Sequence, residues 1–533
     1  MKIKLPLLSI FLLISHLLCA QLIYVPDDYS SVQSAIDAAS AGDTVVVAED
    51  TYFENIDFKG KPITVASKFI LDGDTAHISK TILNGSQPTD EDRASVVTLR
   101  SGEDTSSVLI GFKITGGKGC FDLEDYPMGY GGGILIYESG GKITHNIIAY
   151  NHLGPSEGFP LPYAGGGIYA NVPRNHRAII RDNMIRNNSC SGDIGSGGGV
   201  NLLGENFIFE NNSVLDNTLD MMGEGMGAGV YWQFMYYQGS IGEVLFRNNI
   251  IKGNAGYSEV QAGKGGGLAF SFIEEIEFYN NIICDNYTEG VGGGIFFNDV
   301  RASFFHNTVA DNEAADMGNS LSIYMESSGY DLVFYNNILW SDIQNEIPDI
   351  HLWGMRDPRT SFYYNIIQEA ILQEDSAIVL NNCYRKPGFR NDAYELSEFS
   401  TAIGRGIDSV QIDARWYYSH PVDILGNVRP NPIDSHMDLG AYESGFLFTG
   451  IQTRRTGKLR IYPNPFHISA KLELENIPTV QKIEMINLRG ETVMRMHPST
   501  ENSVRIQRNN LPSGLYFLKV LADTEYVLKM VIK

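Results

Sequence analysis

Carboxylate and imidazole groups are the side chains of this chain with the widest catalytic potential. Eight acidic residues lie in long polar segments ahead of glycine clusters: Asp122, Glu124, Asp125, Glu157, Asp193, Glu224, Glu259 and Glu289. Hydrolysis of a glycosidic bond needs two carboxyl groups about 5–10 Å apart, and no spacing in the sequence pairs any two of these. His145 and His306 each precede a repeated asparagine and are interpreted as wall residues. The sequence therefore assigns no catalytic residue.

Aromatic and amide side chains form a second candidate group, placed just after the glycine clusters. One column of equivalent positions comprises Leu135, Tyr169, Asn201, Tyr231, Ala269 and Phe296. The next comprises Tyr137, Asn171, Leu203, Gln233, Ser271 and Asn298. Aromatic faces and amides suit sugar rings, which present apolar surface beside hydroxyl groups. The candidate glycan-binding residues are Tyr169, Asn171, Asn201, Tyr231, Gln233, Phe296 and Asn298; alternatively, these residues only tolerate an exposed sheet face.

A repeat explains why these positions are equivalent. Glycine triplets recur at 131–133, 165–167, 197–199, 265–267 and 292–294, and Gly227-Ala228-Gly229 is an imperfect copy. Each is followed by Ile, Val or Leu and later by two asparagines five residues apart. The pairs are Asn146/Asn151, Asn183/Asn188, Asn212/Asn217, Asn249/Asn254, Asn281/Asn286 and Asn307/Asn312, with a variant Asn337/Asp342. A variable period with constant landmarks indicates one repeated backbone unit with loops of differing length.

The unit predicts an all-β fold, a right-handed parallel β-helix. Segments such as Val244–Arg247 and Ile276–Tyr279 alternate apolar and polar residues, as strands do. About 30 residues per unit is too short for a helix-containing crossover and suits one coil of three strands and three turns. Stacked coils would align the asparagines into a ladder of amides that bond one another, and the glycines would occupy tight turns.

The N-terminus carries two further signals. Residues 1–20 combine Lys2 and Lys4 with an apolar run and are predicted to be a secretory signal peptide. Cys19 raises the alternative of lipidation, although Leu18 does not fit the small residue expected there. The segment from Ser31 to Ala39 predicts a short amphipathic helix that caps the first coil.

A family resemblance supports this fold. The segments Gly42–Val47 and Tyr52–Ile56 resemble the opening of pectin-lyase-like right-handed β-helix proteins, and Asp423–Pro430 with Asp438–Glu443 resembles the way such domains close in secreted bacterial proteins. The resemblance places the β-helix at 21–445 and implies a substrate groove on the first-strand face. It leaves open three functions: a glycan-binding surface module, a polysaccharide lyase or glycoside hydrolase with a loop-built site, and an adhesin or structural protein. No cofactor is predicted apart from Ca²⁺, which an acidic-sugar lyase would use.

The last segment of the chain has a different character. Residues 446–457 are interpreted as a linker, and 458–533 contain Ile461-Tyr462-Pro463-Asn464-Pro465, Pro512-Ser513-Gly514-Leu515-Tyr516 and a terminal lysine. These features resemble the C-terminal sorting domain of the type IX secretion system of Bacteroidota. The resemblance implies a small β-sandwich recognised by the export machinery, and a location that is secreted or at the outer cell surface.

Charge and cysteine content limit the kinds of partner and metal site that the sequence predicts. The formal net charge is −23. The segment 456–533 carries 11 basic and 7 acidic residues, and the leader two lysines, so the remainder carries −29. Such an acidic body disfavours nucleic acid; no transmembrane span is expected after the leader, and a monomer is expected. Cys120, Cys190, Cys284 and Cys383 lack metal-site spacing; whether Cys120 and Cys190 pair is left open.

Overall fold

The computed structural model describes residues 20–533, except 124–127, 156–161, 235–243, 327–330, 344, 355–359, 369, 372–376, 413, 448–457, 476–479, 481, 488–491, 497–502 and 522–524. The predicted signal peptide thus lies outside the described residues, apart from Ala20. The chain divides into two compact units, Met1–Gly445 and Phe446–Lys533.

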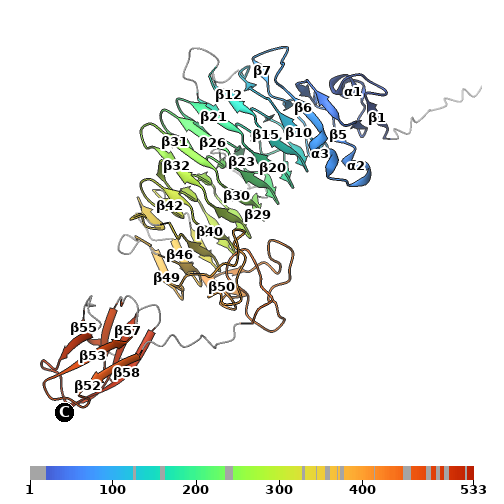
Figure 1. The fold of residues 1–533 in the computed structure, drawn as a ribbon. Coiled ribbons are helices and arrows are strands. Elements are labelled where there is room, and N and C mark those ends of the chain that lie inside the picture. The colour runs from blue at the N-terminus through green and yellow to red at the C-terminus, as the bar shows by residue number, and fades with distance from the viewer. Residues whose placement is uncertain are drawn as a thin grey trace, which may run out of the picture. The chain divides into compact units, whose positions relative to one another are not determined.

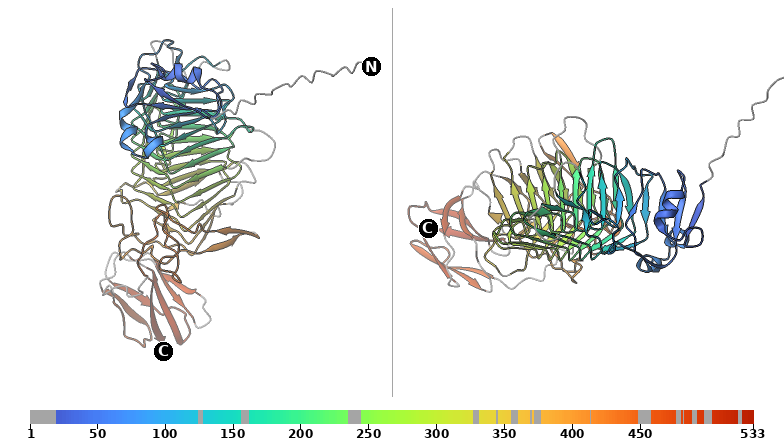
Figure 2. Two further views of the ribbon diagram at one scale, coloured as in Figure 1. Left: turned by 90° about the vertical axis from the view of Figure 1, so that its right-hand side faces the viewer. Right: turned by 90° about the horizontal axis from the view of Figure 1, so that it is seen from above.

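The first unit is a stack of β-coils, visible as strands side by side in Figures 1 and 2. Within the described residues, three long sheets run along it. Sheet A has 13 strands from β1 (Leu22–Val25) to β49 (Ala377–Leu380), and sheet B has 11 from β3 (Asp50–Tyr52) to β47 (Ile366–Ile367). Sheet C has 11 strands, and its neighbouring strands pair in parallel and in register, as in β13 with β18. The β-helix prediction is confirmed.

The strands of sheet C matter most for the site. They are β4 (Ile56–Asp57), β8 (Val97–Leu99), β13 (Ile134–Tyr137), β18 (Ile168–Val172), β23 (Val200–Gly204), β28 (Val230–Gln233), β33 (Leu268–Ser271), β38 (Ile295–Asn298), β42 (Leu321–Tyr324), β45 (Ile350–Trp353) and β48 (Ala370–Ile371).

The expectation of three strands per coil was wrong for the central coils. Two further sheets lie in the connection from sheet B back to sheet C. Sheet E has six parallel strands from β16 (His152–Leu153) to β41 (Glu313–Ala314), among the residues described. Sheet D has eight described strands from β7 (Arg93–Ala94) to β37 (Gly290–Val291). The connection is long enough to form its own stacked layer, which satisfies its backbone groups across coils.

The lumen of the stack is one continuous hydrophobic core from Ile23 to Ile367. Inward residues of sheet A stack ring on ring: Phe246 and Phe278 lie 4.7 Å apart at 5°, and Phe278 and Phe304 lie 4.6 Å apart at 13°. These spacings follow the distance between neighbouring strands. The coil register therefore determines the packing of the core.

Two asparagine ladders line the turns, as predicted. Asn249 Nδ2 donates to Asn281 Oδ1 at 3.0 Å and to the Phe209 carbonyl at 3.1 Å, and its own Oδ1 accepts from the Asn212 backbone at 2.9 Å. This first ladder lies between sheets A and B and runs on through Asn337 and Asn365 to Asn382, further than predicted. The second ladder is described from Asn151 to Asn312. Asp342 does not continue it but is exposed and pairs with Lys386.

The glycine clusters lie in line along one edge of the stack, bonding from coil to coil. Gly132 donates to the Gly165 carbonyl, Gly166 to Gly197 and Ala228 to Gly265, at 3.0–3.1 Å. The first glycine of each cluster has a positive φ, for example +77° at Gly165. A Cβ on the second glycine would meet backbone of the next coil, as at Gly132, where it would lie 2.2 Å from the Gly166 carbonyl. The glycines therefore occupy tight turns, as predicted, and they also allow the backbones of neighbouring coils to approach closely.

The N-terminal end of the stack is covered by a helix. Helix α1 (Val32–Ala38) follows the N-cap Ser31 and buries Val32, Ala35 and Ile36 against the first coil, which confirms the predicted cap. Two short helices, α2 (Phe69–Asp72) and α3 (Ala76–Lys80), follow β5 (Thr64–Ser67). After β49 the chain is mostly irregular up to Gly445, with a hairpin of β50 (Ser409–Ile412) and β51 (Arg415–Tyr418).

The second unit contains two antiparallel sheets around one core. One sheet comprises β52 (Lys458–Tyr462), β53 (Ser469–Glu475) and β56 (Ser503–Gln507). The other comprises β55 (Thr492–Met496), β54 (Lys482–Ile486), β57 (Gly514–Leu521) and β58 (Glu525–Ile532). Leu472, Met485 and Leu518 are fully buried between them, as expected for a small β-sandwich.

Candidate functional site on the outer face of sheet C

Side chains along sheet C alternate between the lumen and the outer face, as predicted. Ile168, Val230 and Phe297 join the luminal core. Tyr169, Tyr231 and Phe296 instead belong to separate clusters outside it. The first column pairs in register from Leu135 through Tyr169 and Asn201 to Tyr231, Ala269 and Phe296.

The first column is nevertheless covered, which corrects the expectation that it is open to solvent. Only 5% of Tyr169, 5% of Asn201, 8% of Tyr231 and 2% of Phe296 is exposed. The cover is sheet D, whose strands run beside sheet C. Tyr130 packs on Tyr169 at a centroid distance of 4.7 Å, and Asn201 Nδ2 donates to Ser196 Oγ at 2.6 Å. A ligand in solution cannot reach these four side chains in this conformation.

The second column is partly open. Asn171, Gln233 and Asn298 are all half-buried and remain accessible candidates. Gln233 is not independent of the first column, because Tyr231 Oη donates to Gln233 Oε1 at 3.0 Å. The structure thus keeps three of the seven predicted residues at the surface.

Both columns continue beyond the last glycine triplet, where the sequence analysis stopped. Phe296 pairs in register with Ser322 and then His351, and Asn298 with Tyr324 and then Trp353. The Tyr324 and Trp353 rings lie 4.5 Å apart at 47°, and His351 and Trp353 lie 6.1 Å apart at 10°. The available signal was Gly318 ahead of Leu321, which is all that remains of the triplet in this coil.

This end of the face has buried polar atoms without partners among the described residues. Ser322 Oγ, His351 Nδ1 and Trp353 Nε1 are buried from water and have no hydrogen bond among the described residues. Burial lowers the pKa of His351, opposed by the nearby Asp316 carboxylate, so the imidazole is neutral at pH 7. Buried polar atoms without partners are uncommon in native proteins, and an ordered water is one group that can supply the missing bond.

Three of the candidate acids on this face have partners within the protein. Lys264 pairs with Glu224 while lying 5.7 Å from the Phe296 ring centroid. Asp122 pairs with Arg93 and Arg100, and Glu289 accepts from the Ser258 backbone at 2.8 Å. Glu124, Asp125 and Glu157 lie outside the described residues. Over the described part of the chain, no group of three or more His, Cys, Asp or Glu side chains could hold a metal ion.

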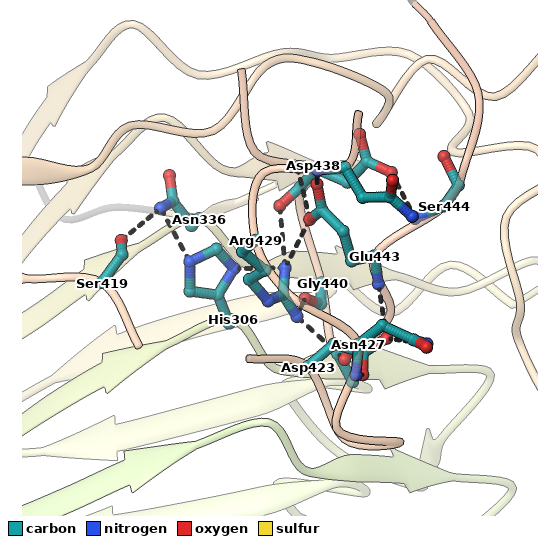
Figure 3. Close-up of polar contacts among 12 residues, drawn as sticks. His306, Asn336, Ser419, Asp423, Asn427, Arg429, Asp438, Gly440, Glu443 and Ser444 are labelled. Carbon is teal, nitrogen blue, oxygen red and sulfur yellow. Dashed lines mark hydrogen bonds and ion pairs between the residues drawn. The ribbon is translucent and has the colours of Figure 1, made fainter. Parts of the chain in front are cut away.

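His306 and His145 are wall residues, as interpreted. His145 packs on Phe69 at 5.1 Å. His306 is buried in the network of Figure 3, where Arg429 Nη1 donates to its Nδ1 at 2.9 Å. Burial and the neighbouring Arg429 hold the pKa of His306 well below its ordinary value. The two histidines lie in different networks and form no acid–base pair.

The structure shows the state of the four cysteines that follow the leader. Cys120, Cys190, Cys284 and Cys383 are free thiols in this structure. Cys120 and Cys190 belong to different clusters of the layer that covers sheet C. Burial raises the pKa of both thiols, which leaves them protonated and unreactive at neutral pH.

Comparison with known proteins agrees with this architecture. Residues 123–272 match the family described as a right-handed β-helix region, and residues 460–533 match the secretion system C-terminal sorting domain. The crystal structure of pectate lyase Pel9A is similar with a TM-score of 0.44 and 13% identity, over 79% of this chain and 96% of that one. XylC, in complex with xylose, has a TM-score of 0.33 and 9% identity, over 80% and 98%. Similarities of this size carry no inference about activity. No curated protein matches the chain.

The protein is a secreted right-handed β-helix protein with a type IX C-terminal sorting domain. The sorting domain implies interaction with the secretion machinery and export to the medium or the cell surface. Among the described helices, none has the length and apolar character required to cross a membrane.

Proposed function

We propose that this exported protein binds a neutral glycan on the outer face of sheet C, at the end that carries Tyr324 and Trp353. The observation that supports the proposal is the pair of partly exposed rings, Tyr324 and Trp353, whose centroids lie 4.5 Å apart at the end of the second column. A sugar fits this surface, because its C–H faces stack on aromatic rings and its hydroxyls can bond the half-buried amide of Asn298 in the same column.

The position of the site also supports binding there. Sheet D is described only as far as β37, with one bridge from Val291 to Met317. Tyr324 of β42 and Trp353 of β45 belong to the second column, and both are half-buried near the end of the described part of sheet D. Asn298 precedes Tyr324 in the same column, so the site extends toward the partly open amides of the central coils.

The test is titration of the full-length protein with neutral polysaccharides, followed by tryptophan fluorescence. Tyr324→Ala and Trp353→Ala should each weaken binding about tenfold, the equivalent of about 1.4 kcal/mol. Tyr257→Ala is the matched control, since this exposed aromatic residue lies on sheet E. Unchanged affinity in both site variants would end the proposal; release of sugar product during the titration would favour an enzyme instead.

The site also predicts a pH profile. A ligand that displaces water from His351 disfavours its charged form further. Binding should therefore be constant at neutral pH and weaken as the pH falls through the lowered pKa of His351, below its ordinary 6.5. His351→Gln should remove this dependence while Tyr257→Ala retains it.

A further inference from the structure

We infer that the hairpin β50–β51 is a second, independent glycan-binding surface, on sheet A, selective for neutral polysaccharides. Its outward face carries four residues: Ser409, Gln411, Trp416 and Tyr418. Gln411 lies opposite Trp416 and Ser409 opposite Tyr418, so all four share one face of the antiparallel pair. The inference does not depend on the site at Tyr324 and Trp353.

The two rings of this face are open to solvent. Trp416 is 51% exposed and Tyr418 is 67% exposed. Their centroids lie 6.2 Å apart and the ring planes are stacked at 23°, so the two rings form one contiguous aromatic surface. Contiguous exposed apolar surface, unlike single scattered residues, marks binding sites, and Trp and Tyr dominate binding surfaces because they offer rigid area at low entropic cost.

The opposite face of the hairpin anchors it to the stack. Val410, Ile412 and Tyr417 pack on the outer residues of sheet A, which include Tyr279, Phe305 and Tyr335. These three rings are themselves stacked, with both centroid distances equal to 4.9 Å. An isolated two-stranded hairpin is marginally stable in water, so this packing is what orders it.

Polar contacts fix the hairpin further. Tyr335 Oη donates to the Tyr418 carbonyl at 2.9 Å, and Asn336 Nδ2 donates to Ser419 Oγ at 2.9 Å. Arg415 pairs with Glu275 on the stack. The aromatic surface is therefore held in place before any ligand arrives, which reduces the entropic cost of binding.

Charge determines the class of ligand. The outward face of the hairpin has no ionisable group other than the Tyr418 phenol, and the Arg415 charge at its edge is neutralised by Glu275. Around it, the chain between the leader and residue 456 carries −29. A polyuronate or a nucleic acid would be repelled by this field, whereas a neutral sugar chain is not. The rings accept its C–H faces, and Gln411 and Ser409 offer hydrogen bonds to its hydroxyls.

The experiment uses the full-length protein in which Tyr324→Ala and Trp353→Ala remove the first site. Affinity electrophoresis in β-glucan, xylan, mannan and polygalacturonate gels measures what binding remains. We expect retardation in at least one neutral gel, and adding Trp416→Ala should weaken it about tenfold, with Tyr418→Ala having a smaller effect. Phe399→Ala is the control, since Phe399 is 84% exposed outside the hairpin.

The outcomes are separable. Replacing an outward side chain should leave the melting temperature unchanged. If Trp416→Ala lowers the melting temperature, Trp416→Phe is the variant to use instead, and it should retain most of the binding. Loss of all neutral-glycan binding in the Tyr324/Trp353 background, with Trp416 intact, would overturn the second site and leave the first standing. Binding only to polygalacturonate, or dimerisation that Trp416→Ala abolishes, would also overturn it.

Discussion

The outer faces of sheets C and A are covered in two different ways. Sheet C is covered by sheet D, to which every central coil contributes a strand. Sheet D buries Tyr169, Tyr231 and Phe296. Sheet A is covered over a few coils by the hairpin β50–β51, which returns from the C-terminal segment to pack on Tyr279, Phe305 and Tyr335. Each strand of the sheet D cover lies close in sequence to the sheet C strand beside it. The hairpin cover instead depends on contacts between residues more than 70 positions apart, as from Ser419 to Asn336.

The difference shows where a β-helix can expose aromatic surface without weakening its core. On sheet C the partly open rings, Tyr324 and Trp353, lie in the second column, beside the column that sheet D buries. On sheet A the open rings, Trp416 and Tyr418, lie on the cover itself, whose inner face completes the packing. Both arrangements leave the luminal core intact.

The largest effect should come from Arg429→Met, which removes the cover of sheet A selectively. Arg429 is fully buried and bonds Glu443 at 3.2 Å, the Gly440 and Ala441 carbonyls at 3.0 and 2.9 Å, and His306 (Figure 3). Leaving Glu443 buried without its partner should cost about 4 kcal/mol. Hydrogen exchange should rise in β50–β51 while sheet C keeps its protection; equal loss on both faces would contradict the distinction.

The next largest effect should come from Asn249→Leu, which weakens the stack itself and therefore affects sheets C and A alike. The first ladder joins sheets A and B in every central coil, and this change leaves the Asn212 backbone N–H and the Asn281 amide short of a partner. We expect a loss of about 3 kcal/mol in urea denaturation. Asn175→Leu, at an exposed loop position, is the control, and equal urea midpoints would mean that the ladder contributes little.

A smaller effect should follow from Leu219→Ala in the layer that covers sheet C. Leu219 is 1% exposed in the small cluster with Leu153, Tyr163 and Cys190. The cavity should cost about 2–3 kcal/mol and raise the accessibility of Tyr169 and Tyr231 to chemical iodination. The hairpin on sheet A should remain protected from proteolysis, and cleavage there would show that the two covers are coupled.

The smallest effect is a pH dependence confined to the network at Arg429. Burial, with the nearby Asp438, raises the pKa of Glu443 to about 7 from 4.5. The folded state therefore holds a proton that the unfolded state has released, so this contribution is present below pH 4.5 and is lost as the pH rises to about 7. Glu443→Gln should flatten the change in melting temperature between pH 5 and pH 8; an unaltered slope would assign it elsewhere.

The sequence predicted the scaffold because its signals are local and repeated. A glycine that needs positive φ, such as Gly165, or an asparagine whose amide must meet its copy in the next coil, such as Asn249, leaves the same mark in each unit. The site was harder to predict, because solvent exposure is not a property of one strand. Tyr169 and Trp353 both occupy outward positions on sheet C, yet Tyr169 in the first column is buried under sheet D whereas Trp353 in the second column is half-buried.

The residues of this chain by themselves determined the stacked coils, the inward and outward alternation, the capping helix, the sorting domain and its export. These features follow from periodicity, turn chemistry and family motifs, all of which can be read from the order of the residues. Only the tertiary structure decided which outward side chains meet water, because this depends on how sheet D folds over sheet C and where the hairpin β50–β51 packs. It also revealed the clustering of Ser322, His351 and Trp353, since registers beyond the last glycine triplet are set by strand pairing alone.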